Sequence, residues 1–204
     1  EIMRHTLTAQ VLARAVKNLY PDTKLAIGPT IKDGFYYDFE FSKPISPDDL
    51  EKIEKEMHQI INSKSSITKK FCSKKDALKV FNTAGESYKQ SIIKESDQED
   101  NFQLYYQDDE AFVDLCRGPH LPTLKHIGAF KLTKLAGAYW KGDSKNKMLT
   151  RIYGTAWKNE KDLKAYLDSI EEAEKRDHRK IGKELNLFHF QEEAPGMVFW
   201  HPDG

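Results

Sequence analysis

The sequence has few cysteines and no long apolar run. Two cysteines, Cys72 and Cys116, occur among 204 residues, which is too few for the disulfide framework of a small secreted domain. We therefore expect a reducing, cytoplasmic compartment. Mean hydropathy is −0.70, and no stretch approaches the roughly 20 apolar residues that a membrane-spanning helix needs. A helical membrane protein is thereby excluded.

The sequence also has no net excess of charge, because 32 Lys and Arg residues balance 32 Asp and Glu residues. The balance hides two blocks of opposite sign. Residues 92–114 contain one base and eight acids, whereas residues 115–151 contain eight bases and one acid. Aromatic residues within the basic block are compatible with a polyanion-binding surface. The alternative is that the two blocks pair with each other or are simply solvated.

Apolar spacing predicts helices and strands in an order without a regular βα repeat, which favours an α+β fold. A 3.6-residue period predicts a helix over residues 6–20, ended by Pro21. Alternating aromatic residues predict a half-buried strand over 35–41. Capping signals at Ser46 and Ser73 predict helices to about residues 62 and 81. Further strands are expected near residues 24–28, 104–106, 111–114, 130–132 and 148–153, and a long helix over 159–185. Residues 83–100 are polar and predict a loop with at most one helical turn.

The richest group of reactive residues is Asp114-Leu-Cys116-Arg-Gly-Pro-His120. A thiol and an imidazole four residues apart around Gly-Pro fit two metal ligands or a thiol–imidazole pair, and a purely structural loop is also possible. Two ligands make half of a zinc site. No second Cys or His pair of matching spacing exists, so His5 and His126 are the remaining candidate donors.

Other candidates have ordinary interpretations by themselves. Tyr37 lies on the apolar side of its predicted strand and fits core packing. Lys89 fits a solvated surface lysine, and the basic turn at 176–180 fits a salt-bridged helix surface. His189 and His201 have no local explanation.

Several of these segments together resemble bacterial-type threonyl-tRNA synthetases. The segments are residues 26–29, 33–38, 114–120, 137–144, 151–157, 176–182 and 192–201. The resemblance covers essentially the whole chain. The editing domain of alanyl-tRNA synthetases shares only a sparser pattern.

The resemblance implies a modular enzyme. Residues 1–157 would form an editing domain, a curved and mostly antiparallel sheet wrapped around a central helix. Residues 158–187 would form a linker helix, and 188–204 the start of a class II catalytic core. Since the chain begins without Met and stops after a new apolar run, we interpret it as a piece of a longer protein. ATP, Mg²⁺ and Zn²⁺ would act in the catalytic core outside this piece, and the full-length enzyme would be a homodimer.

The resemblance also implies a reaction, the hydrolysis of serine mischarged onto threonine tRNA. Asp114 would hold the serine amino group, and Cys116 and His120 would bind the amino acid or order water. Tyr37 and Lys89 would position the substrate and stabilise charge. The basic segment, with Arg117, Lys134 and Lys141, would contact the acceptor end of the tRNA. No metal is expected among these residues.

The sequence departs from the family at the first helix, where the family usually carries His-x-x-x-His. Counting back from Pro21 without gaps, these positions are Thr6 and Gln10, both expected to face the substrate. His5 then lies one residue out of register, or the motif contains a one-residue insertion. On a regular helix, positions 5 and 10 point about 140° apart. Because Gln10 cannot exchange a proton or act as an ordinary zinc ligand, we hypothesise a weakened editing site.

Two alternative functions stay open. The same piece could be a tRNA-binding and spacing module without hydrolysis, or a free-standing editing protein. Continuation into the segment at 195–200, which resembles an edge of the ligase, argues against the free-standing protein.

Overall fold

The structure is a computed structural model that describes residues 1–108, 110–176, 181–182, 184–191 and 197–202. The chain forms two compact units, Glu1–Glu160 and Lys161–Gly204. All candidate site residues lie in the first unit. Within the described ranges, no helix is both long and apolar enough to span a membrane.

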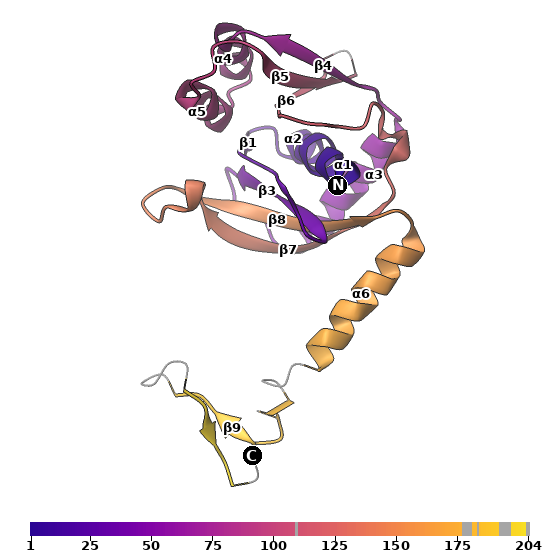
Figure 1. Cartoon of the computed structure of the whole chain (residues 1–204), viewed down its shortest axis with the longest axis vertical. Helices are drawn as coiled ribbons and strands as arrows, with labels where there is room; N and C mark the ends of the chain where they lie inside the picture. Colours follow the sequence, from indigo (N-terminus) through magenta and orange to yellow (C-terminus); the bar gives the residue numbers. More distant parts are fainter. Residues whose placement is uncertain (109, 177–180, 183, 192–196, 203–204) are drawn as a thin grey trace. The chain divides into compact units, whose positions relative to one another are not determined.

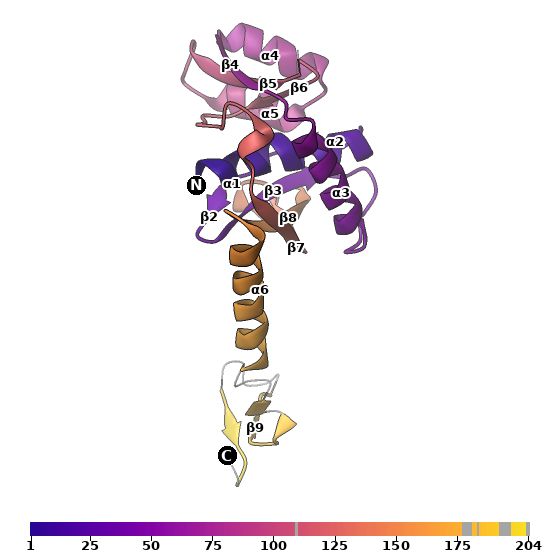
Figure 2. The ribbon, with the colours of Figure 1, turned by 90° about the vertical axis from the view of Figure 1, so that its right-hand side faces the viewer.

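The first unit places one continuous helix between two antiparallel sheets (Figures 1 and 2). The strands of the larger sheet are β1 (Lys24–Leu25), β2 (Thr30–Ile31), β3 (Gly34–Glu40), β7 (Ala129–Tyr139) and β8 (Met148–Trp157). Those of the smaller sheet are β4 (Ile67–Cys72), β5 (Phe102–Gln107) and β6 (Phe112–Leu115). The larger sheet has the strand order β1-β3-β8-β7, with β2 paired to β3, and the smaller has the order β4-β5-β6. The mixture of helices and antiparallel sheets confirms the predicted α+β class.

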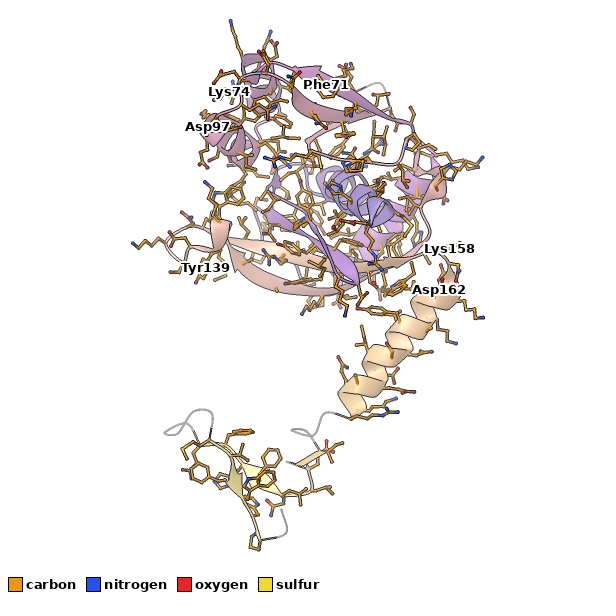
Figure 3. All side chains as sticks on the ribbon, in the orientation of Figure 1. Phe71, Lys74, Asp97, Tyr139, Lys158 and Asp162 are labelled. Atoms are coloured by element: carbon orange, nitrogen blue, oxygen red, sulfur yellow. The ribbon has the colours of Figure 1, made fainter. Side chains whose placement is uncertain are left out.

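The alternation predicted for β3 is present. Phe35, Tyr37 and Phe39 are at most 1% exposed and pack in the main core, as the period-two pattern requires. Asp38 lies on the opposite side of the strand but is also buried. Arg151 on β8 explains its burial, because the guanidinium donates to both Asp38 carboxylate oxygens at 2.7 and 2.8 Å. Figure 3 shows side chains filling the space between the sheets and the helix.

Among the described residues of the first unit there are three further α-helices, α3 (Asp49–Asn62), α4 (Lys74–Thr83) and α5 (Ser87–Glu95). Ser73 caps α4 as predicted, since its Oγ accepts a hydrogen bond from the Asp76 N–H. The predicted loop over 83–100 is wrong, because α5 occupies nine of its residues. One buried side chain, Ile93, joins the cluster of Phe81 and Phe102. Packing of one side thus stabilises a helix whose composition alone is too polar to predict it.

The second unit contains most of α6 (Glu160–Lys175) and a two-stranded antiparallel sheet of β9 (Phe188–His189) and β10 (Phe199–Trp200). Residues 177–180 of the predicted basic turn at 176–180, and the segment at 192–196, lie outside the described residues. Arg176 is described and pairs with Glu172, four residues earlier.

Candidate functional site

The central helix is not regular. It consists of α1 (Ile2–Thr6), a π-helical segment (Leu7–Leu12) and α2 (Ala13–Leu19). At the end of the π-helical segment, the Ala13 N–H donates to the Thr8 carbonyl five residues earlier. A π turn holds one more residue than an α turn. The 140° angle expected between His5 and Gln10 on a regular helix therefore does not apply.

The π-helical segment leaves His5 beside the loop that follows β6. The His5 Nε2 lies 3.1 Å from the Cys116 Sγ. The rings of His5 and His120 are 4.5 Å apart, and the His120 ring also packs edge-on against Tyr105. The predicted meeting of the first helix with the thiol and imidazole after Asp114 is thus present. His5 points toward Cys116, so the hypothesis of a weakened site loses the support that a displaced His5 would give.

Burial keeps all three groups of this cluster neutral at neutral pH. It raises the pKa of the Cys116 thiol to about 11, partly offset by the Gly118 N–H, and lowers the pKa of His120 to about 3, with His5 adding to the effect. Burial also lowers the pKa of His5, although a hydrogen bond to the backbone of Pro119 opposes the shift. Proline offers only a carbonyl, so the imidazole donates there. The His5 Nε2, which faces Cys116, therefore accepts a hydrogen bond from the thiol.

A buried ion pair forms the second part of the site. Lys89 on α5 lies 2.6 Å from the Asp114 Oδ1, and their side chains are 4% and 2% exposed. That oxygen also accepts the Leu115 N–H at 2.8 Å, while the Tyr37 hydroxyl lies 3.4 Å from Oδ2. Burial raises the pKa of Asp114, and Lys89 counteracts it; burial also raises the pKa of Tyr37. Lys89 is therefore not the solvated surface lysine that its local sequence predicts.

These two parts line one cavity of about 680 Å³. Its wall includes five residues of the two parts and Ala9 of the central helix. The five are His5, Tyr37, Lys89, Asp114 and Cys116. Arg117 and the Ile27–Pro29 segment also line it, together with residues of α5 and β5. The volume falls in the range of small-molecule sites. His120 lies behind His5 and Cys116 and is not part of the wall.

Thr6 and Gln10, both predicted to face the substrate, do not line this cavity. The Thr6 hydroxyl donates to the Ile2 carbonyl and accepts the Leu121 N–H at 2.9 Å, which ties the helix to the loop after His120. Gln10 is fully buried and is bonded to Gln107 of β5. The π-helical segment turns Ala9 toward the cavity instead.

Gly28 is a site residue that the local pattern did not single out. A Cβ at Gly28 would lie 2.1 Å from the Tyr37 ring. The backbone therefore approaches that ring more closely than any other residue allows. Gly28-Pro29 marks the end of a predicted strand and belongs to the resembling segment 26–29, but neither signal assigns Gly28 a place in the site.

Comparison with known proteins shows which sequences this chain is similar to. A family model described as the threonyl and alanyl tRNA synthetase second additional domain matches residues 103–153. Threonine–tRNA ligase of Hahella chejuensis (strain KCTC 2396) is 58% identical over 204 residues, which is 100% of this chain and 32% of that protein. The threonine–tRNA ligases of Legionella pneumophila (strain Corby) and Marinobacter nauticus are 55% and 54% identical over the same 204 residues, or 32% and 31% of their lengths. The chain is homologous to one segment of threonine–tRNA ligases.

The chain spans about one third of the length of these threonine–tRNA ligases. The matched range 103–153 begins in β5 and ends in β8. It contains Asp114, Cys116 and His120, while His5, Tyr37 and Lys89 come from elements outside it. The fold therefore assembles the site from residues inside and outside the range that the family model matches.

His5, Cys116 and His120 could together hold a metal ion. Their donor atoms lie within 4.8 Å of one another, and among the described residues no further His, Cys, Asp or Glu joins this group. Both ring nitrogens of His120 are buried without a hydrogen-bond partner among the described residues. Three donors of this type would suit zinc with an open fourth position, once the thiol loses its proton.

The three basic residues predicted to contact tRNA have different surroundings. Arg117 is exposed at the cavity. Lys134 lies over the Tyr153 ring at 4.7 Å. Lys141 pairs with Glu95 of α5, which also lines the cavity. This last pair joins the basic block to the acidic block, which is one of the two alternatives left by the charge pattern.

Proposed function

We propose that this segment is the editing domain of a threonine–tRNA ligase, and that its cavity hydrolyses serine mischarged onto threonine tRNA. One observation carries the proposal: His5, Cys116, Lys89 and Asp114 converge on one cavity in a chain homologous to threonine–tRNA ligases. The reaction has a physical motive. Serine lacks one methyl group of threonine, and a missing methyl gives a synthetic site only about 1–3 kcal/mol of discrimination.

Asp114 is suited to hold the amino group of the serine. Its Oδ1 already accepts from Lys89 and from the Leu115 N–H, whereas its Oδ2 makes a long contact of 3.4 Å to the Tyr37 hydroxyl. A carboxylate oxygen accepts more than one hydrogen bond. Oδ2 would therefore receive the substrate ammonium beside the Tyr37 ring.

Hydrolysis needs a water beside the ester carbonyl and a positive group near the developing oxyanion. The oxygen of that water forms a bond to the carbonyl carbon, the bond to the ribose oxygen breaks, and the ribose oxygen takes up a proton from water. His5 and Cys116, both neutral, would order the water through hydrogen bonds. Lys89 would stabilise the oxyanion electrostatically from its buried position.

The RNA would reach the cavity past Arg117, with Lys134 and Lys141 as further candidate contacts for its phosphates. The parent protein would be a cytoplasmic threonine–tRNA ligase that forms a homodimer. Its use of ATP, Mg²⁺ and Zn²⁺ would belong to the catalytic core, outside this segment.

The test is deacylation of threonine tRNA charged with serine, with threonine-charged tRNA as the matched substrate control. We expect the chain to release serine faster than threonine. His5→Ala should slow the release about a hundredfold, because the attacking water would lose a group that positions it. Thr155→Val, which removes a buried hydroxyl bonded to the Asp33 carbonyl, is the matched control and should keep the rate.

Two results would contradict the proposal in different ways. Binding of the charged tRNA without serine release would indicate the spacing module without hydrolysis. Equal release of serine and threonine would remove the proofreading role. Release of serine at the rate of a threonine–tRNA ligase with both helix histidines would remove the separate hypothesis that this site is weakened.

A further inference from the structure

The π-helical segment decides which side chains of the central helix face the cavity. His5 and Ala9, four residues apart, both line it, and Gln10 does not. Thr6 and Gln10, also four residues apart, are both fully buried and bond to neighbouring elements. The helix therefore has two candidate pairs of positions, and its local geometry selects the pair His5 and Ala9.

Gln107 holds the segment at its centre. Its side chain is fully buried, and its Nε2 donates to both the backbone carbonyl of Gln10 at 2.6 Å and the side-chain Oε1 of Gln10 at 2.9 Å. The side-chain oxygen of Gln107 accepts from Arg14 at 3.1 Å, and Arg14 pairs with Asp108 at 2.7 Å. One amide thus connects the widened turn to the helix that follows it.

The anchor of this contact is paired on both sides within the smaller sheet. Gln107 ends β5, the middle strand of the smaller sheet, where it pairs with Ile67 of β4 and Phe112 of β6. Gln10 has a buried Nε2 without a partner among the described residues. Gln10 therefore meets Gln107 through its two carbonyl oxygens, one of the backbone and one of the side chain.

We propose that Gln107 is a positioning residue for the cavity, which holds the π-helical segment in the register that directs His5 and Ala9, and not Gln10, toward the substrate. The catalytic meaning of this register depends on the proposed hydrolysis, but the register itself does not. Without the Gln107 Nε2 as donor, the additional residue of the π-helical turn should be able to shift along the helix. His5 would then lose its place beside Cys116.

Thiol labelling tests the register without any tRNA. Ala9→Cys and Gln10→Cys are made separately in the full chain with Cys72→Ser and Cys116→Ser, so that each variant has one thiol. With methyl methanethiosulfonate as the probe, we expect Ala9→Cys to react at least tenfold faster than Gln10→Cys. Equal rates, or faster reaction of Gln10→Cys, would overturn the assigned register.

Gln107→Glu tests the positioning role. This variant keeps the shape and the acceptor for Arg14 but, when ionised, cannot donate to Gln10. We expect it to slow labelling of Ala9→Cys at least fivefold, and Thr155→Val to leave the labelling unchanged. Circular dichroism should show a folded chain in each case. A folded Gln107→Glu variant with unchanged labelling would overturn the proposal.

Kinetics connect the register to the reaction. In the chain with its native cysteines, Gln107→Glu should lower kcat for serine release at least tenfold, with little change in KM. If the chain releases no serine at all, the proposed function fails while the labelling results still decide the register. If labelling changes as expected but kcat does not, the register is irrelevant to hydrolysis and the positioning role is overturned.

Discussion

The ion pair of Lys89 and Asp114 offers the sharpest test of how the site is built. Both charges are almost completely buried and lie 2.6 Å apart. Removal of one member of a buried pair costs about 3–5 kcal/mol, because the remaining charge has no solvent and no partner. Lys89→Met keeps most of the apolar length of the side chain and removes its ammonium group, so it should destabilise the first unit by about this amount at neutral pH.

The penalty should depend on pH. Burial raises the pKa of Asp114 and Lys89 lowers it, so the pKa rises further in Lys89→Met. An unfolded aspartate has a pKa of about 3.9. As pH rises above this value, the unfolded chain releases the proton before the folded variant does, and the folded variant loses stability. The difference from the parent chain should therefore be smallest near pH 4 and largest above the raised pKa.

Urea unfolding measures the effect. Trp200→Phe removes the tryptophan of the second unit, so that fluorescence reports Trp140 and Trp157 of the first. With a slope of about 2 kcal/mol/M, the midpoint should fall by about 1.5–2.5 M at pH 7.5. The fall should be smaller at pH 4.5. Lys89→Met with Asp114→Leu, which removes both charges, should be more stable than Lys89→Met alone. A fall below about 0.5 M, or the same fall at both pH values, would refute the burial argument.

Three further predictions concern the cavity. In a Cys72→Ala chain, alkylation of Cys116 by iodoacetamide should accelerate about tenfold per pH unit up to about pH 11, because burial raises the pKa of its thiol to that value; a plateau below pH 9.5 would contradict this. Gly28→Ala should destabilise the fold by about 1–3 kcal/mol and slow serine release, since the new methyl group would overlap the Tyr37 ring; an unchanged thermal midpoint would show that the ring can move away. Dialysis against a chelator should leave serine release unchanged if side chains alone order the water, whereas loss of activity that zinc restores would make His5, Cys116 and His120 a metal centre.

Local sequence patterns predict the elements that are determined by signals within a few residues. The alternation of Phe35, Tyr37 and Phe39 was sufficient for β3, and the Ser73 cap was sufficient for the start of α4. Both signals operate over a few residues, so they do not depend on the rest of the chain. The same local reasoning missed α5, because Ile93 finds its apolar partners only in the folded structure.

The residues of the candidate site that stand in one sequence motif could be predicted. Those that reach the site only through the packing of another element could not. Asp114, Cys116 and His120 stand in one short segment, and the cavity beside them could be anticipated. The burial of Lys89 could not, because it depends on where α5 packs. Whether His5 or Thr6 faced Cys116 was likewise unresolved, since one extra residue can either rotate the end of a helix or widen one turn. The choice depends on Gln107, which lies 97 positions from Gln10 in the sequence.

The most direct test of the central claim is a crystal structure of the chain with a stable substrate analogue, in which serine is joined to the 3′ position of adenosine by an amide. The account predicts that the serine lies in the cavity, with its amino group at the Asp114 Oδ2 and its carbonyl beside Cys116 and Lys89. An analogue bound elsewhere on the chain, or a cavity that stays empty at millimolar analogue, would contradict it.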